Sequence, residues 1–284
     1  MADLRKILSG NVAGEFFVDS SCIDCDLCRQ IAPGTFREAD DVSIVARQPA
    51  TPEEVRRAEM ALLTCPTGSI GTVTKHDLGP AIAAFPEPIE ENVHFCGFAS
   101  DASYGASSYL IVRPQGNVLV DSPRFTAPLV RRIAEMGGVR WMFLTHQDDV
   151  ADHRKFHERF GCDRILHEED AGVAVERPIR GREPVRLDDD LVILPTPGHT
   201  AGHQVLLYRD RFLFTGDHVW WDPASRRLAA SRPYCRHSWS EQRQSMERLL
   251  DWSFEWVLPG HGARHHATVP VMHGELEDLV RRMA

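Results

Sequence analysis

The sequence predicts a layered α/β protein in two parts, a small domain over residues 1–77 and a larger domain over residues 93–284. Two observations predict this organisation. Residues 78–92 contain three prolines, which fix φ and remove backbone donors, so this segment is expected to be an extended linker. After it, short apolar runs alternate with helical patterns, and this alternation is typical of layered α/β folds.

Each expected element follows from a local pattern. The small domain ends in a short β-like stretch at residues 70–73. In the larger domain, apolar runs predict strands at residues 93–98, 108–112, 117–120, 141–145, 191–194, 204–208, 212–215 and 256–258. Helical patterns cover residues 126–136, 151–160 and 269 to the C-terminus. Ser238 and Glu241 have the spacing of a capping box, so another helix is expected from there to about Leu250.

Composition excludes several classes of function. The formal charge of -9 would repel phosphate backbones, and no basic stripe is interleaved with aromatic residues, so no nucleic-acid partner is expected. No apolar stretch approaches the length of a membrane span and no signal-peptide pattern opens the chain, so we expect no membrane partner. Four of the seven cysteines stand in a cluster-binding pattern, which argues against a disulfide framework and for a cytoplasmic protein.

The cysteines of the small domain have the spacing of an iron-sulfur site. Cys22, Cys25 and Cys28 form C-x2-C-x2-C, and Cys65 follows later, directly before Pro66. A cubane cluster needs such a tight triplet and a distant fourth thiolate, because the chain wraps around it. With residues 17–22 and 61–70, this pattern resembles bacterial ferredoxins. The resemblance implies a ferredoxin-like α+β domain with one 4Fe-4S cluster on these four cysteines. A structural zinc on the same thiolates and a three-iron cluster are the alternatives.

Histidine and aspartate motifs follow the expected strands of the larger domain. In order they are Asp121, Thr145-His146-Gln-Asp148-Asp149-Val-Ala-Asp152-His153, Pro197-Gly-His199-Thr, Thr215-Gly-Asp217 and Pro259-Gly-His261-Gly262. Imidazole and carboxylate are ligands of zinc, iron and manganese, and strand-end loops bring several of them to one edge of a sheet. In this order the motifs resemble the metallo-β-lactamase superfamily over residues 93–284, which implies an αββα sandwich.

The resemblance implies one metal on His146, His199 and Asp217, and another on Asp152, His153, His261 and the shared Asp217. Asp121 would brace the ligand loop, and His203 would support it. The usual second histidine of the first motif is absent. Asp148 is expected to take its place, or Asp149 has a role that the pattern does not assign, and a single metal is an alternative to two. A carboxylate there favours iron or manganese over zinc, and flavodiiron proteins of the same superfamily also have one there.

The superfamily performs both hydrolysis and redox reactions. In hydrolysis Asp152 would orient or deprotonate a water activated by metal, and no electron is needed. A fused ferredoxin is hard to explain unless the neighbouring centre changes oxidation state. We therefore expect a redox or oxygen-dependent reaction on a small-molecule substrate, at a mono- or di-iron centre fed by the cluster. The alternatives are a hydrolase of an ester, thioester or lactone, with a structural or regulatory cluster, and a non-catalytic electron-transfer module. A redox partner protein and a homo-oligomer are further expectations.

Two further expectations concern the rest of the larger domain. Residues 218–237 leave a ligand-bearing strand end, so they are expected to overhang the site and contact substrate. The alternative is that Trp220 and Trp221 only pack the loop. The remaining histidines are expected to be solvated surface groups, namely His157, His167, His265, His266 and His273.

Overall fold

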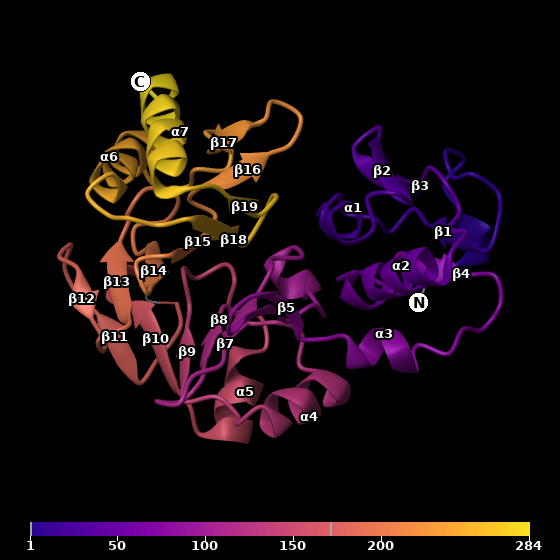
Figure 1. Ribbon diagram of the computed structural model, residues 1–284, viewed down its shortest axis with the longest axis horizontal. Helices are drawn as coiled ribbons and strands as arrows, with labels where there is room; N and C mark the ends of the chain where they lie inside the picture. The colour runs from indigo at the N-terminus through magenta and orange to yellow at the C-terminus, as the bar shows by residue number, and fades with distance from the viewer. Residues whose placement is uncertain (1, 171) are drawn as a thin grey trace. The chain divides into compact units, whose positions relative to one another are not determined.

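The computed structural model describes residues 2–170 and 172–284, which form two compact units (Figure 1). The first unit takes the chain up to Val139 together with Ala151–Phe160. The second unit takes Arg140–Val150 and the chain from Gly161 onward.

The first unit begins with a small α+β arrangement. Strand β1 pairs antiparallel with β4, and β2 pairs antiparallel with β3. Helix α2 begins in a full capping box: Thr51 accepts from the backbone of Glu54, and Glu54 reaches back to Thr51. Because α2 ends at Thr64, Cys65 follows it directly. The bounds are η1 Leu4–Lys6, β1 Phe16–Val18, α1 Leu27–Ile31, β2 Phe36–Ala39, β3 Val42–Val45, α2 Pro52–Thr64 and β4 Ile70–Thr72.

The segment of residues 78–92 is not extended throughout. It contains helix α3 (Gly79–Ala83), whose Pro80 stands in the first turn, where a missing backbone donor costs nothing. It also contains strand β5 (Glu87–Glu90), which tolerates Pro88 because β5 is at the edge of its sheet.

Strand β5 is followed by three more strands of the first unit, which pair antiparallel in the order β5-β6-β7-β8. Helices α4 and α5 also belong to this unit, and their neighbouring rings Phe125 and Phe156 meet edge to face at 5.0 Å. Helix α5 starts two residues later than expected, because Ala151 has a φ of 30°. The bounds are β6 Val93–Phe95, η2 Asp101–Ser103, β7 Tyr109–Ile111, β8 Val118–Val120, α4 Ala127–Glu135 and α5 His153–Phe160.

The second unit contains a parallel set of three strands and a six-stranded sheet. Strand β10 pairs in parallel with β9 and β11. The larger sheet has the order β12-β13-β14-β15-β18-β19, and only β15 and β18 pair in parallel. Helices α6 and α7 share one hydrophobic core with this sheet, formed by residues such as Leu207, Val257, Met246 and Leu276. The bounds are β9 Trp141–Phe143, β10 Asp163–His167, η3 Glu168–Asp170, β11 Arg177–Ile179, β12 Val185–Arg186, β13 Leu191–Pro195, β14 Gln204–Tyr208, β15 Phe212–Gly216, β16 Trp220–Asp222, β17 Arg227–Ala229, α6 Trp239–Leu249, β18 Trp256–Pro259, β19 His265–His266 and α7 Val269–Arg282.

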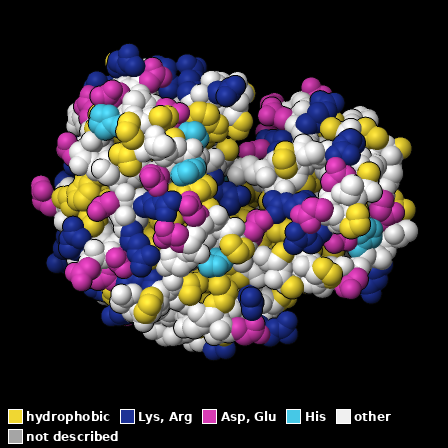
Figure 2. Space-filling view, viewed as in Figure 1, with side chains coloured by type: hydrophobic (Ala, Val, Ile, Leu, Met, Phe, Trp, Pro, Cys, Tyr) yellow, Lys and Arg dark blue, Asp and Glu magenta, His cyan; other side chains and the backbone are white. Residues whose placement is uncertain are grey.

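The distribution of charged side chains on the surface agrees with the absence of a basic stripe from the sequence. Figure 2 shows acidic and basic side chains interspersed over the face in view. Among the residues that the structure describes, no helix is long and apolar enough to cross a membrane.

Candidate functional site

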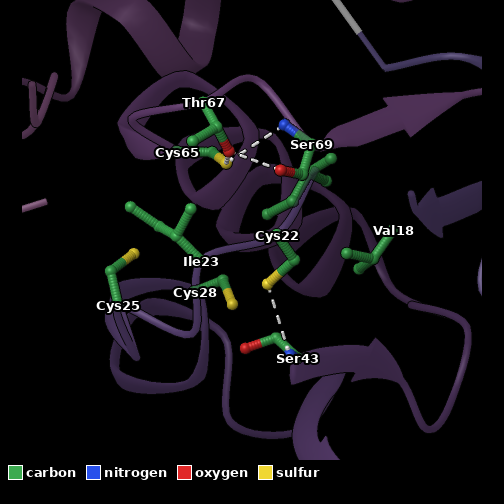
Figure 3. Close-up of a pocket in the computed structure, with 10 residues that line it drawn as sticks. Val18, Cys22, Ile23, Cys25, Cys28, Ser43, Cys65, Thr67 and Ser69 are labelled. Carbon is green, nitrogen blue, oxygen red and sulfur yellow. Dashed lines mark hydrogen bonds between the residues drawn. The ribbon is translucent and has the colours of Figure 1, made fainter. Parts of the chain in front are cut away.

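The cysteines of the first unit lie around one pocket. Cys22 and Cys25 come from the loop that leads from β1 into α1, Cys28 lies in the first turn of α1, and Cys65 directly follows α2. Figure 3 shows their side chains around Ile23, which also lines the pocket. The sequence-distant Cys65 therefore lies beside the triplet, as a four-thiolate cluster site requires.

The cysteine loop is held in an unusual backbone conformation by one arginine. Asp24 and Asp26 both have positive φ, 56° and 68°, in the left-handed region. Arg29 donates to both carboxylates, at 2.5 Å to Asp24 and 2.6 Å to Asp26. Burial alone would lower the pKa of Arg29, but these two carboxylates raise it. This ion-pair network stabilises the turn that brings the three thiols to one side.

The environment of the thiols fits a cluster. The backbone N–H of Ser43 donates to Cys22 Sγ at 3.4 Å, and that of Ser69 donates to Cys65 Sγ at 3.3 Å. Burial raises the pKa of Cys28 to about 12, because a buried thiolate without a cation is unfavourable. Iron would supply the positive charge that keeps these sulfurs ionised.

The ligand candidates of the second unit gather at strand ends. His146 and Asp148 follow β9, His199 follows β13, Asp217 follows β15 and His261 follows β18. Because β15 and β18 run parallel, Asp217 and His261 leave the sheet at the same edge. His261 Nδ1 lies 2.8 Å from Asp217 Oδ1. The structure thus brings together five side chains that the sequence motifs supplied.

Four ligand atoms have the spacing of a metal site. His146 Nε2 lies 3.8 Å from Asp148 Oδ2 and 3.7 Å from Asp217 Oδ2. His199 Nε2 lies 3.6 Å and 3.8 Å from the same two oxygens. These distances are too long for hydrogen bonds. They match the edges of a tetrahedron around one ion, roughly 3.6 Å for metal-ligand distances of about 2.2 Å.

Three of these four atoms have no hydrogen-bond partner among the described residues. They are His146 Nε2, His199 Nε2 and Asp148 Oδ2, and all three are buried. A buried polar atom without a partner is costly, and an ion at the centre would remove this cost for all three. The site therefore fits a resident metal.

Asp149, to which the sequence pattern gave no role, also belongs to this site. His146, Asp149 and Asp217 offer ligand atoms that all lie within 4.8 Å of one another. A Cβ on Gly260 would lie 2.7 Å from Asp149 Oδ2 and 2.8 Å from Asp217 Oδ1, so only glycine fits between these carboxylates. The sequence feature that could have indicated this role is the two-residue insertion between His146 and Asp152, in which Asp149 lies.

Asp152 and His153 belong to the first unit, where Asp152 is bound by its neighbours. Asp152 Oδ2 accepts from the backbone N–H of Phe125 at 2.8 Å, and Oδ1 pairs with Lys155 at 2.7 Å. Burial would raise the pKa of Asp152, but these two donors lower it. His153 is buried at the start of α5, and Asp121 is buried with a φ of 54° directly after β8.

Comparisons with known proteins bear on both units. Residues 18–72 match the family described as the 4Fe-4S single cluster domain of Ferredoxin I. The chain joins a 4Fe-4S ferredoxin domain to a metallo-β-lactamase fold. The fold is shared with the B3 metallo-β-lactamase BLEG-1 (TM-score 0.54, 15% identity, 68% of this chain and 99% of that chain). It is also shared with the DIM-1 metallo-β-lactamase (TM-score 0.53, 18% identity, 70% of this chain and 97% of that chain). A third structure with this fold is the metallo-β-lactamase FIM-1 from Pseudomonas aeruginosa in its mono-zinc form (TM-score 0.51, 15% identity, 69% of this chain and 93% of that chain). No curated protein matches.

The charges and burial of the candidate metal site in the second unit favour a cation. Burial lowers the pKa of His146 to about 4, so its imidazole is neutral at physiological pH. Its Nδ1 lies 3.0 Å from the Thr145 hydroxyl, which leaves Nε2 for the ion. Burial would raise the pKa of Asp217, but His261, His146 and His199 lower it well below its usual range.

Asp170 supports both ligand loops and was missed from the sequence. Its Oδ2 accepts from the backbone N–H of Gln147 at 2.9 Å and from the Thr200 hydroxyl at 2.8 Å. Its Oδ1 accepts from the N–H of Gly202 at 2.9 Å. In sequence it stands in an acidic run, residues 168–170, without any motif spacing that marks it.

Other histidines pack the interior behind the site. His203 bonds the Thr196 hydroxyl at 2.9 Å, and its ring stacks on the buried His218 at 5.1 Å. The expectation of a solvated surface is wrong for His167, which is buried with Nε2 at 2.8 Å from the Gly181 carbonyl.

The tryptophans of the insert pack on the loop after His261. Trp221 stacks on His265 at 3.7 Å, which corrects the expectation that His265 is solvated. Trp220 packs on Gly262, where a Cβ would lie 2.3 Å from the indole. These contacts favour the packing role of both side chains.

Proposed function

We propose that this chain is an oxidoreductase in which the ferredoxin domain supplies electrons to iron in the metallo-β-lactamase domain. When bound, the cluster would supply single electrons, and iron at the second site would accept them and act on a small-molecule substrate or dioxygen. His146, Asp148, His199 and Asp217 would hold one ion. The resemblance assigns Asp152, His153, His261 and the shared Asp217 to a second ion. Asp149 is a further candidate ligand, because it lies close to His146 and Asp217.

The observation that carries this proposal is a series of hydrogen bonds within the first unit. It leads from the last cluster ligand to the first motif of the other domain. Thr64, next to Cys65, accepts from the N–H of Ala99 at 3.2 Å. Phe98 accepts from the N–H of Arg124 at 2.8 Å, and the next residue, Phe125, donates to Asp152.

Two further contacts support the same connection. The Arg124 guanidinium donates to the Leu63 carbonyl at 2.9 Å, at the end of α2. A Cβ on Gly105 would lie 2.7 Å from Cys25 Cβ and 3.1 Å from its sulfur. The chain after β6 thus packs against Cys25 and against Thr64 and Pro66, the residues on either side of Cys65, and this contact supports an electron path.

The donor set also favours iron. Three carboxylates, Asp148, Asp149 and Asp217, stand among the imidazoles of the site, and carboxylates prefer harder cations than an all-histidine set does. Asp152 would act through position rather than as a base, since both of its oxygens are engaged.

A metal-dependent hydrolase is the second candidate. It is favoured by the fold of BLEG-1, DIM-1 and FIM-1, which are all metallo-β-lactamases. Metal analysis after anaerobic purification, followed by assays on esters, thioesters and lactones, separates the two. The redox proposal expects iron in the second site and turnover that depends on an electron donor. Zinc there, with hydrolysis that ignores the state of the cluster, would favour the hydrolase.

A further inference from the structure

We infer that Arg236 is a positioning residue of the metal centre, matched to Asp148. It fixes Asp148 as a one-oxygen ligand and balances the charge that Asp148 brings where the family pattern has a neutral histidine. The inference concerns the metal site and holds for either candidate reaction.

The two oxygens of Asp148 have different surroundings. Oδ1 accepts from Arg236 Nη1 at 3.0 Å. Oδ2 faces His146 and His199 at 3.8 Å and 3.6 Å. Since Arg236 occupies the outer oxygen, only the inner one is available to an ion, and the carboxylate plane is fixed.

The backbone of Arg236 is anchored on the other ligand loop. The N–H groups of Arg236 and His237 both donate to the His199 carbonyl, at 2.9 Å and 3.1 Å. Next to them, the Ser238 N–H and the Cys235 thiol donate to the Gly198 carbonyl, at 3.0 Å and 3.1 Å. The arginine thus joins two ligand loops. Ordinary exposed ion pairs lack this anchoring and contribute little.

Charge explains why the pair is needed. Asp148, Asp149 and Asp217 bring three negative charges to the site. With one divalent ion at the site, which is the single-metal alternative, one negative charge remains in excess, and Arg236 is the cation in contact with the outermost of the three carboxylates. With histidine at position 148 this excess would vanish, so the insert that carries Arg236 and the altered first motif form one adaptation.

Competition with a chromophoric chelator for Fe2+ and for Zn2+, on the full chain with its cluster intact, tests this inference. Arg236→Gln should weaken binding to the second domain by about 10- to 100-fold, as loss of a partner behind a ligand commonly does. Arg236→Lys keeps the charge and should recover part of the affinity. Arg232→Gln, in the same insert, is the matched control and should bind as the wild type does.

A double-mutant cycle makes the test specific. In an Asp148→His background, Arg236→Gln should change the affinity less than about twofold, because its partner is gone. Circular dichroism and cluster absorbance verify that each variant is folded. Wild-type affinity in Arg236→Gln, or an equal loss in both backgrounds, would overturn the inference.

Discussion

The cluster loop and the metal centre are built in opposite ways. Three of the four cysteines lie within seven residues, Cys22 to Cys28, and a single arginine pins the turn between them. The candidate metal centre instead takes its proposed ligands from loops after β9, β13, β15 and β18. Local sequence therefore determines the first site, whereas the second depends on the packing of a whole sheet. Substitution of one cysteine should therefore leave the rest of the protein unchanged, whereas substitution of one ligand of the metal centre should disturb several other ligands.

Asp217→Asn should give the largest effect. Asp217 Oδ2 faces His146 and His199 while Oδ1 bonds His261, so its loss disturbs three ligands at once. We expect at least about a 100-fold fall in metal affinity of the second domain, with cluster absorbance unchanged. Metal analysis and the visible spectrum measure both. Wild-type metal content would contradict the central place given to Asp217.

Cys25→Ser tests the cluster in the way that Asp217→Asn tests the metal centre. It should abolish the brown absorbance of the cluster, because each thiolate holds one iron corner. Metal in the second domain should remain, as measured by elemental analysis after removal of the cluster iron. Retention of sulfide-linked iron would refute the four-cysteine assignment.

Gly105→Ala should destabilise the cluster loop from outside it. Gly105 has a φ of 85°, and its new Cβ would meet Cys25. Left-handed strain costs about 1–2 kcal/mol and overpacking about 1–3 kcal/mol more. Gly161→Ala is the control, because Gly161 has a φ of 66° but nothing within 4 Å of the added atom. Urea-induced loss of cluster absorbance should come at lower urea for Gly105→Ala than for Gly161→Ala. Equal midpoints would show that the contact with Cys25 is unimportant.

The two sites should also differ in proton release. Burial raises the pKa of Cys28 to about 12, so this thiol is protonated at neutral pH in the apoprotein and must lose its proton to bind metal. Burial lowers the pKa of His146 to about 4, so this ligand is already neutral. Calorimetry of Zn2+ binding in buffers of different ionisation enthalpy should therefore find more protons released by the cysteine loop than by the metal centre. The reverse order would contradict these assignments.

Sequence reasoning succeeded for elements that a local apolar pattern specifies. Uninterrupted apolar runs predicted strands such as β14, whose bounds agree with the expectation. Strand β10 was missed, because Arg164 and His167 interrupt its apolar pattern. Both side chains are buried, and they bond to Glu176 and to the Gly181 carbonyl respectively.

At the candidate metal centre, the motifs supplied five side chains that the structure brings together. They did not identify Asp170 or Arg236, since their partners lie far away along the chain. Nor did they show that Phe125 and Lys155 hold Asp152, because tertiary packing alone brings these donors to its carboxylate.

The proposed electron path is tested most directly by Mössbauer spectroscopy of the 57Fe-loaded protein. Chemical reduction should convert iron of the second domain to the ferrous state in the wild type, and much more slowly in Cys25→Ser, which lacks the cluster. Gly161→Ala should behave as the wild type does. Equal reduction with and without the cluster, or zinc in place of iron at His146, Asp148, His199 and Asp217, would contradict the account.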